Sequence, residues 1–176
     1  MTILFIVFGV FATLALLVAL FGLTQPRQVK LVVSRNISAS QETLYPYISN
    51  LENFVKWSPW SKKDPEMTQR FEGVAGEVGS AYFWSGNKKV GKGSMTILAL
   101  QEPRFTKIAL NFGPRGGAEV SFELIPLGDK TQVDWVFEND LGANPLSRAF
   151  GPLMKKMITT DFQNGLIQLE IVCAQS

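Results

Sequence analysis

The chain has 176 residues, and its 17 lysines and arginines nearly balance 15 aspartates and glutamates, which leaves a net charge of +2. This balance argues against a nucleic-acid-binding protein, which would carry a basic stripe. The chain contains no histidine and a single cysteine, Cys173. It therefore lacks the residues for a histidine-dependent catalytic triad, a structural zinc site or an iron–sulfur cluster, and we expect no metal and no cofactor.

Residues 2–23 form an apolar run without a single charge. A helix of about 20 such residues covers the roughly 30 Å hydrocarbon core of a bilayer. A secretory signal peptide would have a basic start, a shorter apolar core and a small-residue cleavage site, and a buried core helix would be shorter. The run therefore favours an uncleaved, single-span membrane anchor over both alternatives.

Three cations, Arg27, Lys30 and Arg35, follow the run. By the positive-inside rule they place the rest of the chain in the cytoplasm, and the single cysteine agrees with a reducing compartment. We expect residues 1–24 to be a transmembrane anchor, residues 25–28 a short tether, and residues 29–176 one domain with a core of its own.

The domain is expected to begin with one strand and two short helices. Residues 29–33 are a β-branched run typical of a strand. Ser38 or Ser40 is a suitable N-cap for a helix, and a second short helix is expected over residues 53–60. The apolar residues that follow the N-cap at helical spacing are Leu44, Tyr47, Ile48 and Leu51.

From residue 67 the apolar pattern changes to a period of two, which is typical of strands. Turn residues separate the strands by short connections, which favours an antiparallel meander with one wet face and one covered face. Trp84 and the glycines around residues 86–93 predict a hairpin in which the ring lies over bare backbone. The expected strands are residues 67–72, 80–85, 90–100, 106–112, 118–125 and 132–138.

The last segment is expected to be a long helix that covers the sheet. Asn144 and Pro145 are typical of a helix start, and apolar residues then recur at three- and four-residue steps. Gly151, followed by proline, predicts a kink or restart. Gly165 indicates a close approach to another element, because glycine inside a helix costs about 1 kcal/mol relative to alanine.

Several motifs stand out along the domain: residues 33–40 (VSRNISAS), 57–60 (WSPW), 64–65 (DP), 71–73 (FEG), 79–87 (GSAYFWSGN), 91–93 (GKG) and 161–166 (DFQNGL). With this order of elements they resemble the START-like helix-grip (SRPBCC) superfamily, especially bacterial, membrane-anchored members of the polyketide cyclase/dehydrase-like group. The resemblance covers residues 28–176. It implies an α+β fold with a curved antiparallel sheet of about seven strands wrapped on the C-terminal helix. It also implies that the protein is located at the bacterial plasma membrane.

In that architecture the sheet curls around the long helix and leaves an elongated cavity, which implies a site for a lipid or a flat apolar molecule. Packing of the core is the alternative role for every aromatic residue in this region, and Trp57 and Trp60 are also suited to plugging the mouth of the fold. The candidate lining residues are Trp57, Trp60, Tyr82, Trp84, Phe112, Phe122, Trp135, Phe150, Met154 and Met157.

An enzyme would need an acid or a base inside this cavity. The strand alternation places Glu123, Asp134 and Glu138 on the wet face, while Asp161 on the last helix can face either way. No pair of carboxylates is spaced for acid–base catalysis. Cys173 is typical of a small buried hydrophobic residue, so no catalytic residue is assigned.

The sequence therefore favours a membrane-tethered binding module that holds a lipid or another apolar small molecule. A polyketide cyclase/dehydrase-like enzyme is the alternative, and it predicts a buried carboxylate or the Tyr82 hydroxyl in the cavity with a perturbed pKa. A structural or partner-binding domain without a ligand is the third hypothesis, and it predicts a filled interior rather than a cavity of several hundred Å³.

Overall fold

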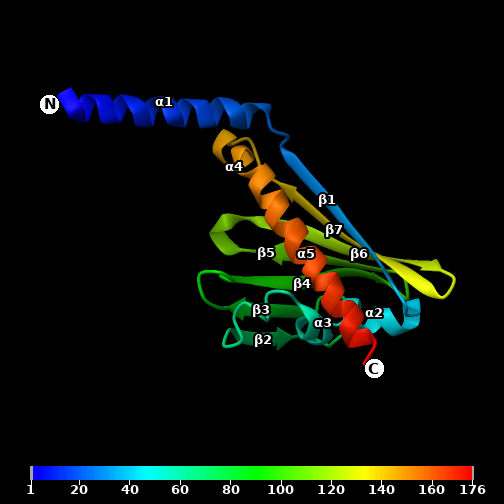
Figure 1. The fold of residues 1–176 in the computed structure, drawn as a ribbon. Coiled ribbons are helices and arrows are strands. Elements are labelled where there is room, and N and C mark those ends of the chain that lie inside the picture. Colours follow the sequence, from blue (N-terminus) through cyan, green and yellow to red (C-terminus); the bar gives the residue numbers. More distant parts are fainter. Residues whose placement is uncertain (1, 176) are drawn as a thin grey trace.

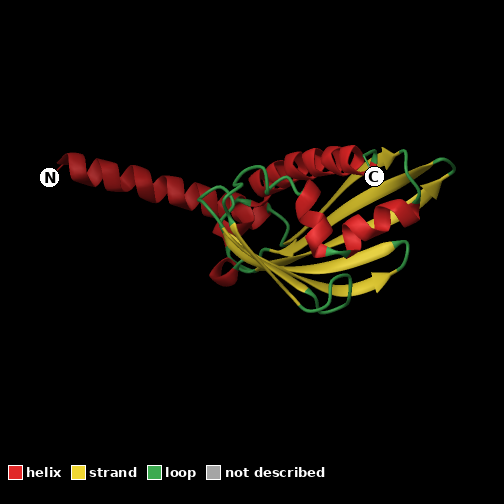
Figure 2. Ribbon diagram, turned by 90° about the horizontal axis from the view of Figure 1, so that it is seen from below, coloured by secondary structure: helices red, strands yellow, loops and turns green. Residues whose placement is uncertain are grey.

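A long helix, α1 (Thr2–Thr24), projects from a domain in which helices lie on one side of a curved sheet (Figures 1 and 2). The structure is a computed structural model and describes residues 2–175. In chain order the domain contains β1 (Gln28–Ile37), α2 (Gln41–Ser49), α3 (Leu51–Trp57), β2 (Thr68–Glu72), β3 (Ala81–Ser85), β4 (Lys92–Gln101), β5 (Phe105–Asn111), the 3₁₀ turn η1 (Gly113–Arg115), β6 (Gly117–Leu127), β7 (Lys130–Asp140), α4 (Pro145–Ala149) and α5 (Gly151–Cys173). The predicted α+β helix-grip architecture is confirmed.

The described strands form one seven-stranded antiparallel sheet in the order β1-β7-β6-β5-β4-β3-β2. The first strand pairs with the last, so that Val33 lies opposite Trp135. A register shift between Ile97 and Ala99 of β4 marks a bulge, which bends a strand and increases its twist. The sheet therefore curves around the helices, as Figure 2 shows.

The two faces of the sheet differ as the period-two pattern predicts. Phe122 and Trp135 are almost fully buried on the concave face, whereas Glu123 is exposed and Asp134 only half-buried on the other. The buried residues on β6 and β7 are Ala118, Val120, Phe122, Leu124, Thr131, Val133, Trp135 and Phe137.

The short helices α2 and α3 begin at side-chain caps. The Ser40 hydroxyl accepts a hydrogen bond from the Thr43 amide, and the Asn50 side chain accepts one from the Glu52 amide at 2.8 Å. Because Asn50 caps the second helix, that helix spans Leu51–Trp57 instead of the predicted residues 53–60.

Several strand boundaries also differ from the sequence pattern. β1 continues to Ile37, past residue 33, because its polar half still pairs with β7 as far as Thr131. Met67 and Val90 precede their strands in turns, where each amide bonds a carbonyl three residues earlier. These boundaries depend on which residues pair with a neighbouring strand, and the periodicity of one strand does not contain that information.

The C-terminal helix restarts at Gly151, as predicted, so that the five-residue α4 precedes the 23-residue α5. The second half of α5 packs into the core. A Cβ atom on Gly165 would lie only 2.7 Å from Cζ3 of Trp135, which confirms the predicted close approach. The buried residues on this half are Phe162, Gly165, Leu166, Leu169 and Cys173.

An aromatic cluster occupies the centre of the core beneath α5. The ring of Trp135 stacks on Phe162, with centroids 3.8 Å apart and an interplanar angle of 10°. Phe54, Trp57 and Phe122 meet the same indole at centroid distances of 6.1, 5.2 and 4.9 Å. This cluster joins α3, the sheet and α5.

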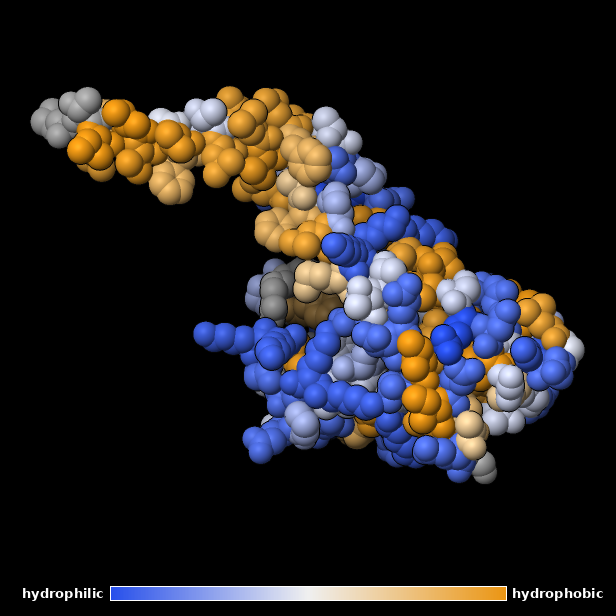
Figure 3. Space-filling model, in the orientation of Figure 1, coloured by the Kyte–Doolittle hydropathy of each residue, from blue (hydrophilic) through white to orange (hydrophobic). Residues whose placement is uncertain are grey.

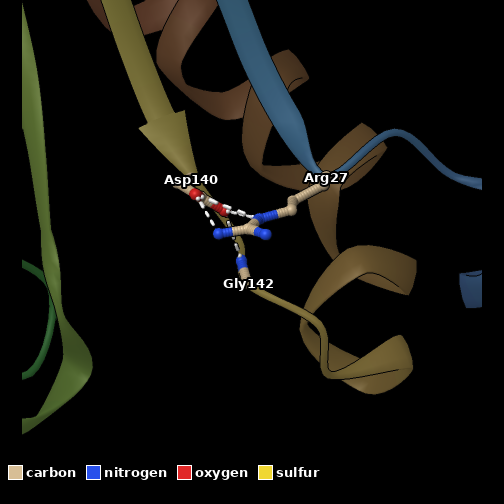
Figure 4. Close-up of polar contacts among 3 residues, drawn as sticks. All are labelled: Arg27, Asp140 and Gly142. Atoms are coloured by element: carbon tan, nitrogen blue, oxygen red, sulfur yellow. Dashed lines mark hydrogen bonds and ion pairs between the residues drawn. The ribbon is translucent and has the colours of Figure 1, made fainter.

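The segment between α1 and β1 is bonded to the end of β7. Arg27 donates to both carboxylate oxygens of Asp140 at 2.7 Å (Figure 4). The Arg27 carbonyl accepts a hydrogen bond from the Leu141 amide at 2.9 Å. The hydrogen bond from Arg27, followed by that from the Gly142 amide, lowers the pKa of Asp140. The connection to α1 is therefore part of the folded domain.

Candidate ligand cavity

A cavity of about 360 Å³ lies between the concave face of the sheet and α5. Small-molecule sites have volumes of roughly 300–1,000 Å³, so this cavity is large enough for a small ligand. Its lining residues are Phe54, Ser58, Trp60, Lys63, Met67, Tyr82, Trp84, Lys89, Val90, Met95, Leu110, Phe112, Val120, Trp135, Phe137, Phe150, Leu153, Met154, Met157, Ile158, Asp161 and Phe162. The lining is dominated by aromatic and aliphatic side chains.

Most of the candidate residues named from the sequence meet around this cavity. They come from the loop after α3, from β3 and β7, from the residue that follows β5, and from the α4–α5 junction and the first turns of α5. The candidates that line it are Trp60, Tyr82, Trp84, Phe112, Trp135, Phe150, Met154 and Met157. Residues more than 90 positions apart in the chain therefore line the same cavity.

Two candidates, Trp57 and Phe122, lie elsewhere. Their exposed fractions are 1% and 0%, and their ring centroids are 5.8 Å apart within the aromatic cluster. The Trp57 Nε1–H donates to the carbonyl of Tyr47 at 3.0 Å, which directs the indole toward α2 and away from the cavity. These two residues belong to the packed core.

Trp84 shapes the side of the cavity formed by the β3–β4 hairpin. A Cβ on Gly93 would lie 2.6 Å from Cζ2 of Trp84, so the ring rests on bare backbone as predicted. The ring of Trp84 stacks with Tyr82 at a centroid distance of 5.7 Å and meets Phe112 edge-on at 6.1 Å. Glycine at position 93 is thus required for this aromatic wall.

A small polar group lies at the cavity, where the sequence left the direction of Asp161 open and did not predict its partner. The Lys63 ammonium lies 2.6 Å from Oδ1 of Asp161, and their side chains are 38% and 18% exposed. Lys89 and Ser58 also contribute to the lining. Asp161 faces the cavity. The sequence signal for this direction is its position four residues before the buried Gly165, on the same face of α5.

Tyr82 is the ionisable aromatic residue of the wall. Burial raises the pKa of Tyr82 to about 12, and its hydroxyl lies 4.0 Å from the sulfur of Met67. The phenol therefore keeps its proton at neutral pH.

The other acidic groups and the thiol lie outside the cavity. Glu138 pairs with Lys30 at 2.8 Å, and Asp134 accepts a hydrogen bond from Gln132 at 2.9 Å, both on the outer face of the sheet. Burial raises the pKa of the Cys173 thiol to about 11, which keeps it protonated. Among residues 2–175, no cluster of three potential metal ligands occurs.

Residues 28–173 match the family model for polyketide cyclase / dehydrase and lipid transport proteins. The chain belongs to this family. No curated protein is similar enough to the chain to match it. The family model covers the whole domain that forms the cavity, and it ends at the last residue of α5.

Solved structures share the fold of this family member at low sequence identity. Ara h 8.0201 has a TM-score of 0.62 and 10% identity over 85% of this chain and 99% of its own. The Aha1 dimer from Colwellia psychrerythraea has a TM-score of 0.57 and 20% identity, with coverages of 81% and 93%. CalU16 from Micromonospora echinospora has a TM-score of 0.57 and 14% identity, with coverages of 81% and 73%. These similarities establish the helix-grip fold.

Proposed function

We propose that the protein is a membrane-tethered binding module that holds a lipid or another apolar small molecule between its sheet and α5. The observation that carries this proposal is the cavity of about 360 Å³ with a mainly apolar, aromatic wall. Such walls, with a few polar groups that orient the ligand, are typical of small-molecule sites. Membership in a family described by lipid transport supports the same class of ligand.

The polar group at the cavity favours an amphipathic ligand. Lys63 and Lys89 bring two positive charges and Asp161 one negative charge, while most of the remaining wall is apolar. A ligand with an apolar body and one polar end would match both parts of this lining. Met154 and Met157 suit variable apolar shapes, because their side chains are unbranched and flexible.

The tether in this proposal is α1. It is long and apolar enough to cross a membrane, and its apolar residues are not buried inside the described structure. A secretory signal sequence has the same properties, so the mass of the mature protein distinguishes the two. An intact α1 in the mature chain supports an anchor. The cations after it favour a cytoplasmic domain.

Native mass spectrometry of the full chain, released from detergent micelles, tests the proposed ligand. We expect a co-purifying adduct with the mass of a lipid or another apolar molecule. Met154→Trp, which adds volume to the wall, should remove this adduct. Ile167→Trp on the outer face of the same helix is the matched control and should retain it, because Ile167 is 38% exposed and does not line the cavity.

Two results would contradict the proposal: an empty wild-type protein, or an adduct that the Met154→Trp variant retains.

A cyclase- or dehydrase-like activity is the second candidate, and Tyr82 is the observation in its favour. Its hydroxyl lies at the cavity wall and has a raised pKa, as that hypothesis predicts. A group that titrates near 12 exchanges protons poorly at neutral pH, and Asp161 is paired with Lys63. Binding is therefore favoured. Tyr82→Phe separates the two candidates, since a binding module keeps its adduct while an enzyme loses turnover.

A further inference from the structure

The first half of the C-terminal helical segment carries a stripe of exposed apolar residues. Leu146, Phe150, Leu153 and Met157 are 52%, 67%, 52% and 61% exposed. Phe150, Leu153 and Met157 are spaced three and four residues apart, which places them on one side of the start of α5, and Leu146 lies on the adjacent α4. A contiguous patch of large apolar side chains in water marks an interaction surface.

This apolar stripe borders the cavity. Phe150, Leu153 and Met157 line the cavity and are also exposed on the surface, so they form one rim of its mouth. Lys63 and Lys89 also line the cavity, and Lys63 pairs with Asp161 of α5. The mouth therefore combines an apolar rim with charged side chains.

The stripe lies beside α1. The backbone of Gly22 touches α4 so closely that a Cβ there would lie 1.8 Å from the carbonyl oxygen of Pro145. In Figure 3 the apolar surface of α1 passes directly onto the neighbouring part of the domain. The helix of membrane-spanning length and the apolar rim thus form one continuous surface.

Arg148 of α4 holds this arrangement together. Its Nε donates to the carbonyl of Gln25 at 2.7 Å and its Nη2 to the carbonyl of Leu23 at 3.0 Å. These bonds occupy carbonyls at the end of α1, where a helix has no internal partners for its last turn. Together with the Arg27–Asp140 ion pair they link α1 to the domain at two points. The direction of α1 relative to the mouth is therefore set by specific bonds.

Basic residues flank the stripe at the same end of the molecule. Lys155 and Lys156 on α5, and Lys88 and Lys89 in the β3–β4 connection, are exposed. In Figures 1 and 2 that connection lies on the side of the domain toward which α1 projects, below α1 in Figure 1. Lysines around an apolar surface complement the anionic headgroups of a bilayer.

We propose that the exposed side of α4 and the first two turns of α5 is a bilayer-docking surface. Arg148 and α1 hold this surface in the headgroup region, with the apolar rim inserted and the lysines on anionic phosphates. The cavity mouth then opens onto the membrane, so an apolar ligand exchanges with the lipid phase without crossing water. A protein partner fits less well, because it would share its space with the bilayer around α1. The inference rests on the proposed role of α1 as an anchor.

Site-directed spin labelling of the full chain in lipid nanodiscs tests this surface. The discs contain phosphatidylcholine and phosphatidylglycerol, and the background variant is Cys173→Ala. The label is placed by Leu146→Cys, an exposed position that does not line the cavity, or by Ile171→Cys near the other end of α5, which is 44% exposed. Relative collision rates with oxygen and with a water-soluble nickel chelate report the depth of each label.

We expect oxygen to dominate at position 146 and the nickel chelate at position 171, so that the depth parameter changes sign between them. Adding Arg148→Ala should shift position 146 toward the aqueous value. Arg104→Ala at the β4–β5 turn is the matched control and should leave it unchanged. Equal aqueous values at positions 146 and 171, in discs that retain the protein, would overturn the docking surface alone. Failure of the mature chain to stay in the discs would instead overturn the anchor.

Discussion

Gly165→Ala tests the closest contact between α5 and the aromatic cluster. An alanine Cβ would lie 2.7 Å from Cζ3 of Trp135 and 3.2 Å from Cδ of Pro59. Ordinary contacts between carbon atoms are about 3.5–4.0 Å. Trp135 has little room to retreat, because it is 1% exposed and stacks on Phe162 at 3.8 Å.

Two opposing effects decide the sign of this substitution. Alanine is favoured over glycine inside a helix by about 1 kcal/mol. Overpacking of a dense core costs about 1–3 kcal/mol. We therefore expect Gly165→Ala to lower the free energy of unfolding by about 1 kcal/mol, and the Tm by about 3 °C.

The assay is thermal and urea unfolding of the full chain in detergent micelles, followed by near-ultraviolet circular dichroism. A double-mutant cycle with Trp135→Phe isolates the contact, because phenylalanine lacks the distal part of the indole. In that background Gly165→Ala should be neutral or stabilising. If Gly165→Ala instead raised the free energy of unfolding of the otherwise wild-type protein by about 1 kcal/mol, the value expected from helix propensity alone, the close packing would be refuted.

Three further predictions follow from burial and hydrogen bonding. Phe122→Ala should cost about 3–5 kcal/mol, because it opens a cavity at a fully buried ring, while Met157→Ala at the mouth should stay within about 0.5 kcal/mol in the same unfolding assay. The pKa of Asp140 is lowered by Arg27, so this carboxylate stabilises the fold above about pH 4 and loses that effect as the pH falls through its native pKa. Asp140→Asn should therefore be less stable at pH 7 and should show a flatter loss of stability in acid titrations. The pKa of Cys173 is raised to about 11, so iodoacetamide at pH 8 should alkylate the native protein much more slowly than the urea-unfolded protein.

Each of these has a clear opposing result. Equal losses for the Phe122 and Met157 variants would contradict the division between core and mouth. An acid titration of Asp140→Asn that follows the wild-type curve would show that the ion pair does not act on stability. Equal alkylation rates before and after unfolding would place Cys173 in contact with water. Burial raises the pKa of Cys173, so the buried neutral thiol stabilises the fold fully at pH values below the pKa of the thiol in the unfolded chain. This stabilisation declines as the pH rises toward 11.

Much of the fold follows from local patterns that the chain carries in short windows. The period-two pattern over residues 118–125 predicted a strand with one covered face, and Asn144 followed by Pro145 predicted the start of α4. The unfavourable glycine at position 165 predicted a close approach, although not its partner. These features depend on neighbours within a few residues, so sequence alone reports them.

The site required long-range packing. Trp57 and Trp60 have the same local pattern, yet the bond from Trp57 to the Tyr47 carbonyl turns one ring into the core, while Trp60 lines the cavity. The pairing of Lys63 with Asp161 joins residues 98 positions apart. No local rule predicts which way such side chains turn.

The sequence by itself determined that a charge-free helix of bilayer length precedes an antiparallel, helix-covered sheet, because periodicity and charge are properties of neighbouring residues. Only the tertiary structure decided how that helix joins the domain. Arg148 reaches back 123 residues to the Gln25 carbonyl, and Gly22 lies against Pro145. Those contacts form when distant segments are brought together, so the direction of α1 relative to the cavity mouth is a property of the folded molecule.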